Sequence, residues 1–466
     1  MIKQGMGMGK TAALLLVLVW LTASYIVMPL PAKADFKTIV VPDDYSTIQE
    51  AIDAANEGDT VFVKEGNYQE ETLEISKSIS FVGEDAKETE IYFVTPLVDK
   101  QILGGVIQVR STAFLVNADE VTISGFTLDS KEYTPIYDME EFSANGDGIK
   151  MIDNIIGKNF ILDFKGDQLS VIGNSVLSGL RADGSNQTIT RNVILGLASF
   201  GNWSRIFENT INSSLTLRGS FNQISDNALS TIKLWDANSN LITNNTFTSL
   251  HVGYDGRACS NNMISKNSII GPDDFGILMS AGSNNLFHDN LIYNYTAGYG
   301  VAIGGNGLVA ENNIFYRNLF INNDLHVSAG WEVEGAGNIW DNGEEGNYWD
   351  DYTGSDSNRD GIGDVPYTVE GYKWSYEVDG VVVDELVSFA FGTDHYPLMF
   401  PFDVDYFSVE LPELAVDSPD SSPSPSQSSS LQEPEPFSPV FVAIAFIASA
   451  TAVGATLLFY FKKRKH

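Results

Sequence analysis

The densest group of possible metal ligands is an acidic run near the C-terminal third of the chain, which reads Asp356-x-Asn358-x-Asp360-Gly361-Ile362-Gly363-Asp364. Hard cations such as Ca²⁺ bind several oxygen ligands at once, from carboxylates, amides and backbone carbonyls. Side-chain oxygens at positions 1, 3 and 5, glycine at 6, the Ile362 carbonyl and Asp364 at 9 match the start of a calcium loop. Position 12 is Tyr367, where an EF-hand has glutamate. The run predicts a short structural calcium turn, and the alternative is an acidic Asx turn without metal.

A second set of charged residues could face a carbohydrate. Glycoside hydrolysis requires two positioned carboxylates, and the candidates for a ligand wall are Asp255, Arg257, Asp273 and Asp274. Ordinary loop charges are the competing interpretation. The sequence names no catalytic set, so enzymatic activity is left open and a binding role is favoured.

Copper ligands are scarce. Copper suits imidazole and soft sulfur ligands, and the candidates are scattered: His251, His288, His326, His395 and Cys259. The sequence holds no His-x-His pair and no Met-rich tract. Cys259 is the only cysteine, so it cannot form an intramolecular disulfide, and we expect a buried structural thiol.

The elements that would position these residues belong to an internal repeat between Asn159 and Ile314. An apolar residue is followed three positions later by Asn, and two positions after that by another apolar residue. The repeats are Ile156/Asn159/Ile161, Val171/Asn174/Val176, Ile189/Asn192/Ile194, Ile206/Asn209/Ile211, Ile224/Asn227/Leu229, Ile242/Asn245/Phe247, Ile264/Asn267/Ile269, Phe287/Asn290/Ile292 and Val309/Asn312/Ile314. Such a period is typical of a solenoid. Its spacing grows from 18 (Asn227 to Asn245) to 22 (Asn245 to Asn267), which places Asp255 and Arg257 on an enlarged corner.

The repeat predicts short strands. Its segments are rich in β-branched residues and too short for helices. Asn tolerates the left-handed backbone region, so we expect it at the corner between two strands, with the Asn side chains stacked in a hydrogen-bonded ladder. The apolar residues beside it would build a continuous core. The sequence thus predicts an all-β, right-handed, single-stranded parallel β-helix.

A short helix is predicted before the solenoid. Ser46 and Gln49 have capping-box spacing, and the apolar face is formed by Ile48, Ala51, Ile52 and Ala55. We expect this helix to cover the open N-terminal end. Between Leu128 and Asn159 we expect the chain to leave the solenoid as a loop.

Sugars could be carried by this chain or bound by it. Sequons for N-glycosylation occur at Asn186, Asn202, Asn212, Asn244 and Asn294. Aromatic residues gather toward the C-terminal repeats: Tyr293, Tyr295, Tyr299, Phe315, Tyr316, Trp331 and Trp340. Exposed rings would stack on sugars, but we expect most of these rings in the core and the cap.

Two stretches carry a family resemblance. "DDYSTIQEAIDAANEGDTVFVKEGNYQEETLEISKSISFVGE" and "VTISGFTL" resemble right-handed parallel β-helix proteins of the pectate-lyase-like superfold. "GNYWDDYTGSDSNRDGIGDVPYTV", with "DHYPLM" (Asp394 to Met399), is similar to the NosD-like group. The first resemblance implies the fold, and lyases of that fold typically use calcium with a basic residue. The second implies copper delivery.

Both ends of the chain predict export and anchoring. Residues 1–34 have basic residues, an apolar run and an A-x-A site at Ala32-Lys33-Ala34, which indicates a signal peptide, or alternatively an uncleaved anchor. A β-helix ectodomain (35–410, with a C-terminal cap at 346–400) is followed by a Pro/Ser-rich stalk (411–439), an apolar span (440–461) and a basic tail (462–466). The positive-inside rule places the C-terminus in the cytoplasm and the β-helix outside.

The net charge of −34 argues against nucleic acid as a partner. Taken together, the sequence predicts a single-pass cell-surface protein that binds a surface polysaccharide or glycoprotein and is stiffened by Ca²⁺. The alternatives are a tethered polysaccharide lyase or glycosidase and a NosD-like copper accessory factor.

Overall fold

The computed structural model describes residues 36–94, 97–102, 105–110, 112–130, 140–271, 273–304, 310–329, 337–375 and 385–402. The chain divides into two compact units, Met1–Pro412 and Glu413–His466, and all described residues belong to the first. The predicted signal peptide, the stalk, the apolar span and the basic tail lie outside the described residues. No helix within the described ranges is long and apolar enough to cross a membrane.

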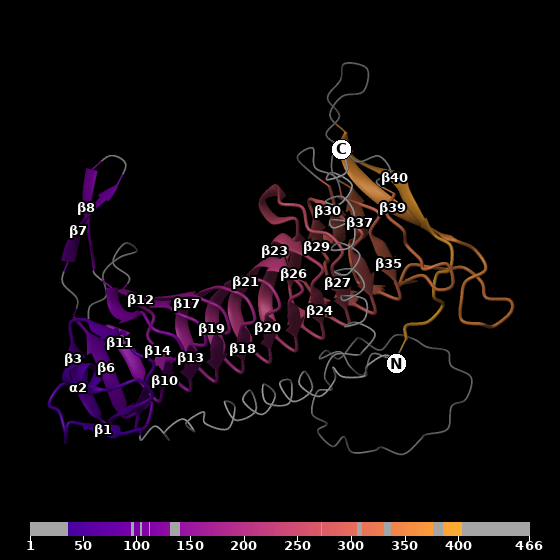
Figure 1. The fold of residues 1–466 in the computed structure, drawn as a ribbon. Coiled ribbons are helices and arrows are strands. Elements are labelled where there is room, and N and C mark those ends of the chain that lie inside the picture. The colour runs from indigo at the N-terminus through magenta and orange to yellow at the C-terminus, as the bar shows by residue number, and fades with distance from the viewer. Residues whose placement is uncertain are drawn as a thin grey trace, which may run out of the picture. The chain divides into compact units, whose positions relative to one another are not determined.

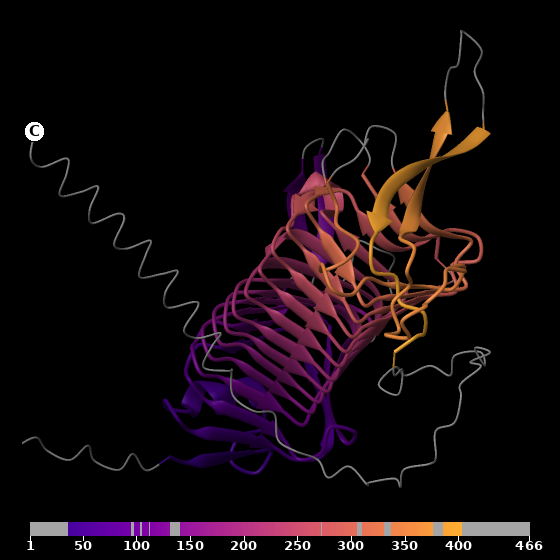
Figure 2. The same ribbon diagram turned by 90° about the vertical axis from the view of Figure 1, so that its right-hand side faces the viewer.

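Short parallel strands stack into one long sheet, because each rung contributes a strand rich in β-branched and other apolar residues. Figures 1 and 2 show these rungs following one another along the coil. In spatial order the 13 strands are β1 (Thr38–Val41), β2 (Thr60–Val63), β5 (Ser80–Gly83), β10 (Thr122–Ser124), β13 (Lys150–Ile152), β16 (Ser170–Ile172), β18 (Thr188–Thr190), β20 (Arg205–Phe207), β22 (Gln223–Ser225), β24 (Leu241–Thr243), β27 (Met263–Ser265), β31 (Leu286–His288) and β35 (Ile314–Tyr316).

A second sheet of 21 strands forms the rest of each rung. Its longer strands bend at a register shift, as β17 does between Val176 and Gly179. The strands are β3 (Gly66–Glu70), β4 (Leu73–Ile75), β6 (Thr89–Phe93), β9 (Thr112–Val116), β11 (Thr127–Ser130), β12 (Glu140–Asn145), β14 (Ile155–Ile156), β15 (Phe160–Lys165), β17 (Ser175–Asp183), β19 (Val193–Phe200), β21 (Thr210–Ser220), β23 (Ala228–Asn238), β25 (Thr246–Phe247), β26 (Ser249–Val252), β28 (Ser268–Ile270), β29 (Phe275–Met279), β32 (Leu291–Tyr293), β33 (Tyr299–Ile303), β36 (Leu319–Ile321), β37 (Leu325–Ala329) and β38 (Tyr348–Trp349).

The core is a set of apolar columns that run along the coil. The middle residue of each strand in the first sheet pairs with its equivalent in the next rung and points inward. This column reads Ile39, Val61, Phe81, Ile123, Met151, Val171, Ile189, Ile206, Ile224, Ile242, Ile264, Phe287 and Phe315, all of them buried. Each rung therefore buries its apolar face only because a neighbouring rung covers it.

The predicted asparagine ladder is present at the corner between the two sheets. Each ladder Asn except the last donates its backbone N–H (2.8–3.1 Å) and its side-chain Nδ2 (2.9–3.1 Å) to the Oδ1 of the Asn one rung further on. The ladder runs Asn154, Asn174, Asn192, Asn209, Asn227, Asn245, Asn267, Asn290, Asn318 and Asn347. Every buried polar group of these side chains has a partner, so the ladder can lie inside the fold.

A second ladder, which the sequence analysis missed, lines the other corner of the first sheet. Asn240, Asn262, Asn285 and Asn313 are bonded in the same way; Asn222 joins this ladder through its backbone N–H alone, and Asn338 accepts at its end. At both corners the left-handed residue is the one before the ladder Asn, for example Arg191 (φ 57°) before Asn192. The prediction that the Asn itself adopts the left-handed conformation is wrong. The Asn side chain serves the hydrogen bonds of the ladder, and the residue before it adopts the left-handed conformation.

The first and last predicted repeats are out of phase. Asn159 lies outside the ladder, which starts from Asn154, and Ile161 is exposed. Asn312 is the left-handed residue (φ 57°) that precedes Asn313 of the second ladder. The predicted loop between Leu128 and Asn159 is also wrong in part, because β12, β13 and β14 continue the rungs through residues 140–156. The intervening residues 131–139 lie outside the described ranges.

The predicted N-terminal helix is α2 (Ile48–Ala54), and it buries Ile48, Ala51 and Ile52. Its N-cap is shifted by one residue from the prediction: Thr47 accepts from the backbone N–H of Glu50 at 3.3 Å. Gln49 instead bonds the backbone of Glu74 in β4, as acceptor at 2.9 Å and as donor at 3.1 Å. This exchange joins the helix to the second sheet.

Three smaller pairings lie outside the two long sheets. They are the antiparallel hairpin β7 (Leu97–Ile102) with β8 (Gly105–Arg110), the parallel pair β30 (Gly282–Ser283) with β34 (Ala310–Glu311), and the antiparallel pair β39 (Tyr367–Ser375) with β40 (Glu385–Asp394). Strand β39 contacts β37, where Ser328 donates its hydroxyl to the Tyr372 carbonyl at 3.2 Å. The β39–β40 hairpin therefore covers part of the last rungs.

The first ladder ends on an aspartate. Asp394 Oδ2 accepts from the Asn347 backbone N–H at 2.7 Å and from Trp349 Nε1 at 2.9 Å, and its Oδ1 accepts from the Tyr396 N–H at 3.0 Å. Gly346 has no room for a side chain, because a Cβ would lie 1.7 Å from Asp394 Oδ1. Burial raises the pKa of Asp394 to about 6, although these N–H donors oppose that shift. Together, the motif residues Gly346, Asn347, Trp349 and Asp394 thus close the end of the ladder, and we call this group the ladder terminus.

Candidate functional site

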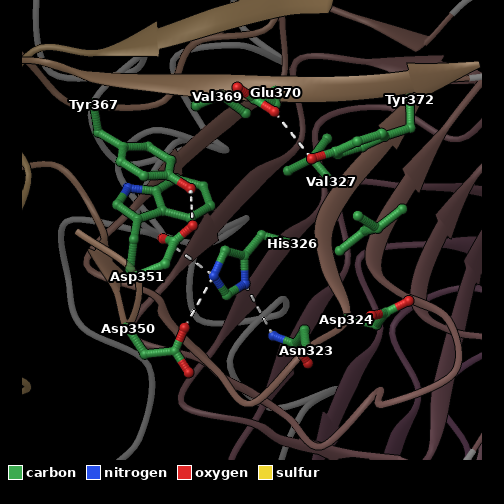
Figure 3. Close-up of a pocket in the computed structure, with 12 residues that line it drawn as sticks. Asn323, Asp324, His326, Val327, Asp350, Asp351, Tyr367, Val369, Glu370 and Tyr372 are labelled. Atoms are coloured by element: carbon green, nitrogen blue, oxygen red, sulfur yellow. Dashed lines mark hydrogen bonds and ion pairs between the residues drawn. The ribbon is translucent and has the colours of Figure 1, made fainter. Parts of the chain in front are cut away.

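A cavity of about 190 Å³ lies at the C-terminal end of the coil, between the last rungs and strand β39 (Figure 3). Strand β37 and the turn before it supply one wall, the residues at the end of β38 supply the second, and β39 supplies the third. The lining residues are Asn323, Asp324, Leu325, His326, Val327, Trp349, Asp350, Asp351, Tyr367, Val369, Glu370 and Tyr372.

His326 is the centre of this site. Its side chain is only 9% exposed, and its Nε2 lies 3.0 Å from Asp350 Oδ1 and 3.4 Å from Asp351 Oδ1. Figure 3 shows both carboxylates on one side of the imidazole and Asn323 on the other, 3.4 Å from Nδ1. Within the described part of the chain, these three residues form the one group of His, Cys, Asp or Glu side chains whose ligand atoms converge within 4.8 Å.

The carboxylates control the charge of the imidazole. Burial lowers the pKa of His326, but the hydrogen bonds to Asp350 and Asp351 and their negative charges outweigh it, so the pKa rises to about 9. Burial also raises the pKa of Asp351, but the hydrogen bond to His326 and the charge of His326 hold that pKa below its ordinary value. Without another cation in the site, the raised pKa makes His326 an imidazolium whose Nε2–H faces both carboxylates.

Aromatic rings and the ladder end hold this group in place. Tyr367 donates its hydroxyl to Asp351 Oδ2 at 3.1 Å, and its ring stacks on Trp349 with centroids 4.6 Å apart. Trp349 also stacks on Phe320 and is bonded to Asp394. Because Asp350 and Asp351 follow Trp349 directly, the ladder terminus also positions the two carboxylates.

The cavity is strongly acidic. Its lining carries four carboxylates, Asp324, Asp350, Asp351 and Glu370, against the single cation of His326. Anionic ligands such as uronates would be repelled, whereas neutral polyhydroxyl groups and cations would be accepted. The half-buried Tyr372 donates its hydroxyl to Glu370 at 2.9 Å, which presents a ring and a carboxylate side by side.

The predicted calcium turn lies in the connection between β38 and β39, next to the cavity but outside its lining. Asp356 accepts from the backbone N–H groups of Arg359 and Gly361, at 2.6 and 2.9 Å, and Asn358 donates to Asp360 at 2.8 Å. Asp360 accepts from the Ile362 N–H at 3.0 Å. Asp364 turns away to Ser355 and Ser357. The loop has the hydrogen bonds of an Asx turn, and calcium binding there stays a prediction.

The predicted ligand wall is only partly assembled. Asp255 lies in the 3₁₀ turn η1 (Tyr254–Gly256), and both it and Arg257 are exposed. Asp273 accepts from the Thr248 hydroxyl at 2.8 Å and lies close enough to His251 to oppose the lowering of that residue's pKa by burial and Lys233. Asp274 is exposed beside it. None of the four lines the cavity around His326.

The other predicted residues are placed as follows. Cys259 is buried, as predicted, and burial raises its thiol pKa. Tyr295, Phe315 and Trp340 are core residues, also as predicted, while Trp331 lies outside the described residues. His288 pairs with Asp289 and His395 with Asp341, and within the described residues neither histidine joins the ligand group of His326. Four sequon residues, Asn186, Asn202, Asn212 and Asn244, are exposed, and Asn294 is half-buried.

Asp350, Asp351 and Tyr367 are not among the site residues that the sequence predicts, and His326 is predicted only as one of several scattered histidines. The signal that could have found them was the distinctive motif itself, whose "WDD" sits between the ladder residue Asn347 and the acidic turn. The pairing of His326 with those aspartates depends on the stacking of β37 near β38, which no local pattern reveals.

Comparison with known proteins agrees with this fold. Residues 178–347 match the family model described as a right handed beta helix region. The match confirms the resemblance to right-handed parallel β-helix proteins, and it spans the regular rungs from β17 to the residue before β38. The similarity to the NosD-like group stays a prediction. Curated proteins gave no match to the chain.

Solved structures show likeness of fold at low identity. The A-module of the mannuronan C-5 epimerase AlgE6 of Azotobacter vinelandii is 13% identical, over 63% of this chain and 92% of that one, with a TM-score of 0.46. The catalytic domain of a GH87 α-1,3-glucanase is 14% identical over 69% and 71% (TM-score 0.49), and a variant of the PL6 family alginate lyase AlyGC is 14% identical over 67% and 51% (TM-score 0.47). Likenesses of this size concern the fold and not the activity.

Proposed function

We propose that this chain is a cell-surface carbohydrate-binding protein whose ligand enters the cavity around His326. The observation that carries the proposal is the composition of that cavity: two tyrosine rings, Tyr367 and Tyr372, beside carboxylates and the Asn323 amide. Rings stack on the apolar faces of sugars, and fixed carboxylates and amides bond their hydroxyls. The four lining carboxylates favour neutral sugars over uronates.

The same proposal includes the parts of the chain that the sequence alone suggests. The signal peptide, the stalk and the apolar span at 440–461 would display the β-helix outside the cell, and α2 would cover the N-terminal end of the coil. Calcium in the turn at Asp356–Asp364 would stiffen the connection between β38 and β39, whose two ends carry Asp351 and Tyr367.

An enzyme is the second candidate, and a specific arrangement argues against it. Hydrolysis needs one carboxylate free to donate a proton and another free to attack or to activate water. Asp350 and Asp351 are instead both bonded to His326. The copper alternative fits poorly as well, because one imidazole with two carboxylates is a harder ligand set than Cu⁺ prefers.

The binding role is tested by measuring retention of the purified full-length chain on neutral, amino and acidic polysaccharides. We expect retention on a neutral or amino polysaccharide, and we expect Tyr372→Ala to weaken it about tenfold, which corresponds to about 1.4 kcal/mol, because a stacking surface is lost. Tyr254→Ala, which removes an exposed ring outside the cavity, is the matched control and should have no effect.

Two results would contradict the proposal. The first is preferential retention on acidic polysaccharides that does not depend on Tyr372. The second is release of reducing ends or unsaturated products that persists after repurification, which would mean that the chain is an enzyme.

A further inference from the structure

We propose that His326, Asp350 and Asp351 bind a divalent cation of the Zn²⁺ or Mn²⁺ type, with an open coordination position toward the cavity. The inference goes beyond carbohydrate binding and does not depend on it, because the ion is measured without any glycan present.

The spacing of the three ligand atoms carries the proposal. Zn²⁺ binds imidazole nitrogen and carboxylate oxygen at roughly 2.0–2.2 Å, so the ligand atoms around a tetrahedral ion lie about 3.3–3.6 Å apart. The His326 Nε2 atom lies 3.0 Å from Asp350 Oδ1 and 3.4 Å from Asp351 Oδ1. Shifts of a few tenths of an ångström would admit an ion in place of the proton that these atoms now share.

The surroundings supply the second line of evidence. A protein ligand set of three leaves a tetrahedral ion one position for water or a ligand atom, and here all three ligand residues line a cavity that has room for it. Two further carboxylates, Asp324 and Glu370, line the same cavity, so a dication enters a negative field. Tyr367 bonds the second oxygen of Asp351 at 3.1 Å and fixes the orientation of that carboxylate.

The ligand chemistry selects the class of ion. An imidazole with two carboxylates suits borderline divalent ions, whereas Ca²⁺ requires six to eight oxygen ligands and Cu⁺ prefers sulfur. The site also differs from the predicted calcium turn, whose side chains bond backbone N–H groups and each other. An ion here would offer its open position to hydroxyl oxygens of a bound sugar.

The test uses the full-length chain, stripped with a chelator and then dialysed against Zn²⁺, Mn²⁺ or Ca²⁺. We expect one Zn²⁺ or Mn²⁺ per chain that His326→Ala removes and that Asp351→Asn weakens at least tenfold. Co²⁺ substitution should give visible absorption bands that both variants lose. The matched control is Asp356→Asn in the acidic turn, which should leave Zn²⁺ binding unchanged.

Three results would overturn the inference. They are no Zn²⁺ or Mn²⁺ uptake by the unmodified chain, uptake that survives both substitutions, and uptake lost in Asp356→Asn but not in Asp351→Asn. Should His326→Ala fail to fold, Asp351→Asn decides the question alone, because the Asp351 side chain is 59% exposed and its replacement by an amide of the same shape leaves the core intact. If the metal-free chain still binds the glycan, carbohydrate binding is supported, and the idea that the ion contacts the bound sugar is refuted.

Discussion

Replacing Asn227 by alanine is expected to lower the free energy of unfolding by about 4 kcal/mol, because it opens the first ladder in the middle of the coil. Asn227 Oδ1 accepts from the backbone N–H and the Nδ2 of Asn209, both at 3.0 Å. Its Nδ2 donates to the carbonyls of Ile206 and Ser225 and to Asn245 Oδ1, at 2.8–2.9 Å. The substitution removes these five hydrogen bonds, each worth about 0.5–1.5 kcal/mol, and leaves the buried Asn209 backbone N–H without its acceptor.

The measurement is denaturant unfolding of the full-length chain, made in a host without N-glycosylation. Asn212→Ala is the matched control, since Asn212 lies in the neighbouring strand β21 and is exposed. We expect that substitution to change the free energy of unfolding by less than about 0.5 kcal/mol. Equal losses in the two variants would show that asparagine in general, and not the ladder, provides the stability.

Asp394→Ala is expected to cost about 3–5 kcal/mol, because it leaves three N–H donors without their acceptor. The substitution removes the acceptor for the Asn347 N–H, the Trp349 indole and the Tyr396 N–H. Asp350 and Asp351 directly follow Trp349 in the sequence. We therefore expect this variant to lose the contacts of the two carboxylates with His326 as well as stability. Unfolding monitored by tryptophan fluorescence should show the C-terminal rungs melting before the rest of the coil.

The charge of Asp394 adds a pH dependence with a defined sign. Its pKa is raised from 3.8 when unfolded to about 6 when folded, so the folded state binds the proton more tightly. The contribution of Asp394 to stability is therefore fully present below about pH 4, is lost as the pH rises from about 4 to 6, and is constant above. The shift corresponds to about 3 kcal/mol.

Asp394→Asn is the variant that tests this dependence. It keeps one acceptor oxygen for Asn347 and Trp349 and cannot ionise, so its stability should lack the decrease between pH 4 and 6. A decrease of the same size in Asp394→Asn would assign the titration to another group.

The sequence was informative wherever a contact is repeated. The units from Val171/Asn174/Val176 to Phe287/Asn290/Ile292 are correct in phase, and their apolar members are all buried. The phase fails at Asn159 and Asn312 because asparagine serves two purposes at a corner. It fits the left-handed position, as Asn312 does, and it forms the ladder, as Asn313 does, and a single sequence does not separate the two uses.

The acidic turn and the ligand wall show a different limit. Asp356, Asn358 and Asp360 form a recognisable pattern because they are predicted metal ligands that lie close together in the sequence. The contacts among them are also local. Asp255 and Arg257 were chosen because the rungs lengthen there, but extra residues at a corner do not specify where their side chains point. Both are exposed rather than gathered into a cavity.

By itself, the sequence determined the solenoid, the apolar columns and one asparagine ladder of this protein, because each depends on a residue type that recurs at the length of a rung. Only the tertiary structure decided the site. His326 belongs to the last rungs, Asp350 and Asp351 follow the end of the ladder, and Tyr367 begins the hairpin that covers them. These residues meet once and at different sequence separations, so no repeated sequence pattern predicts their contact. The contact follows from the stacking of the rungs and from the packing of the final hairpin against them.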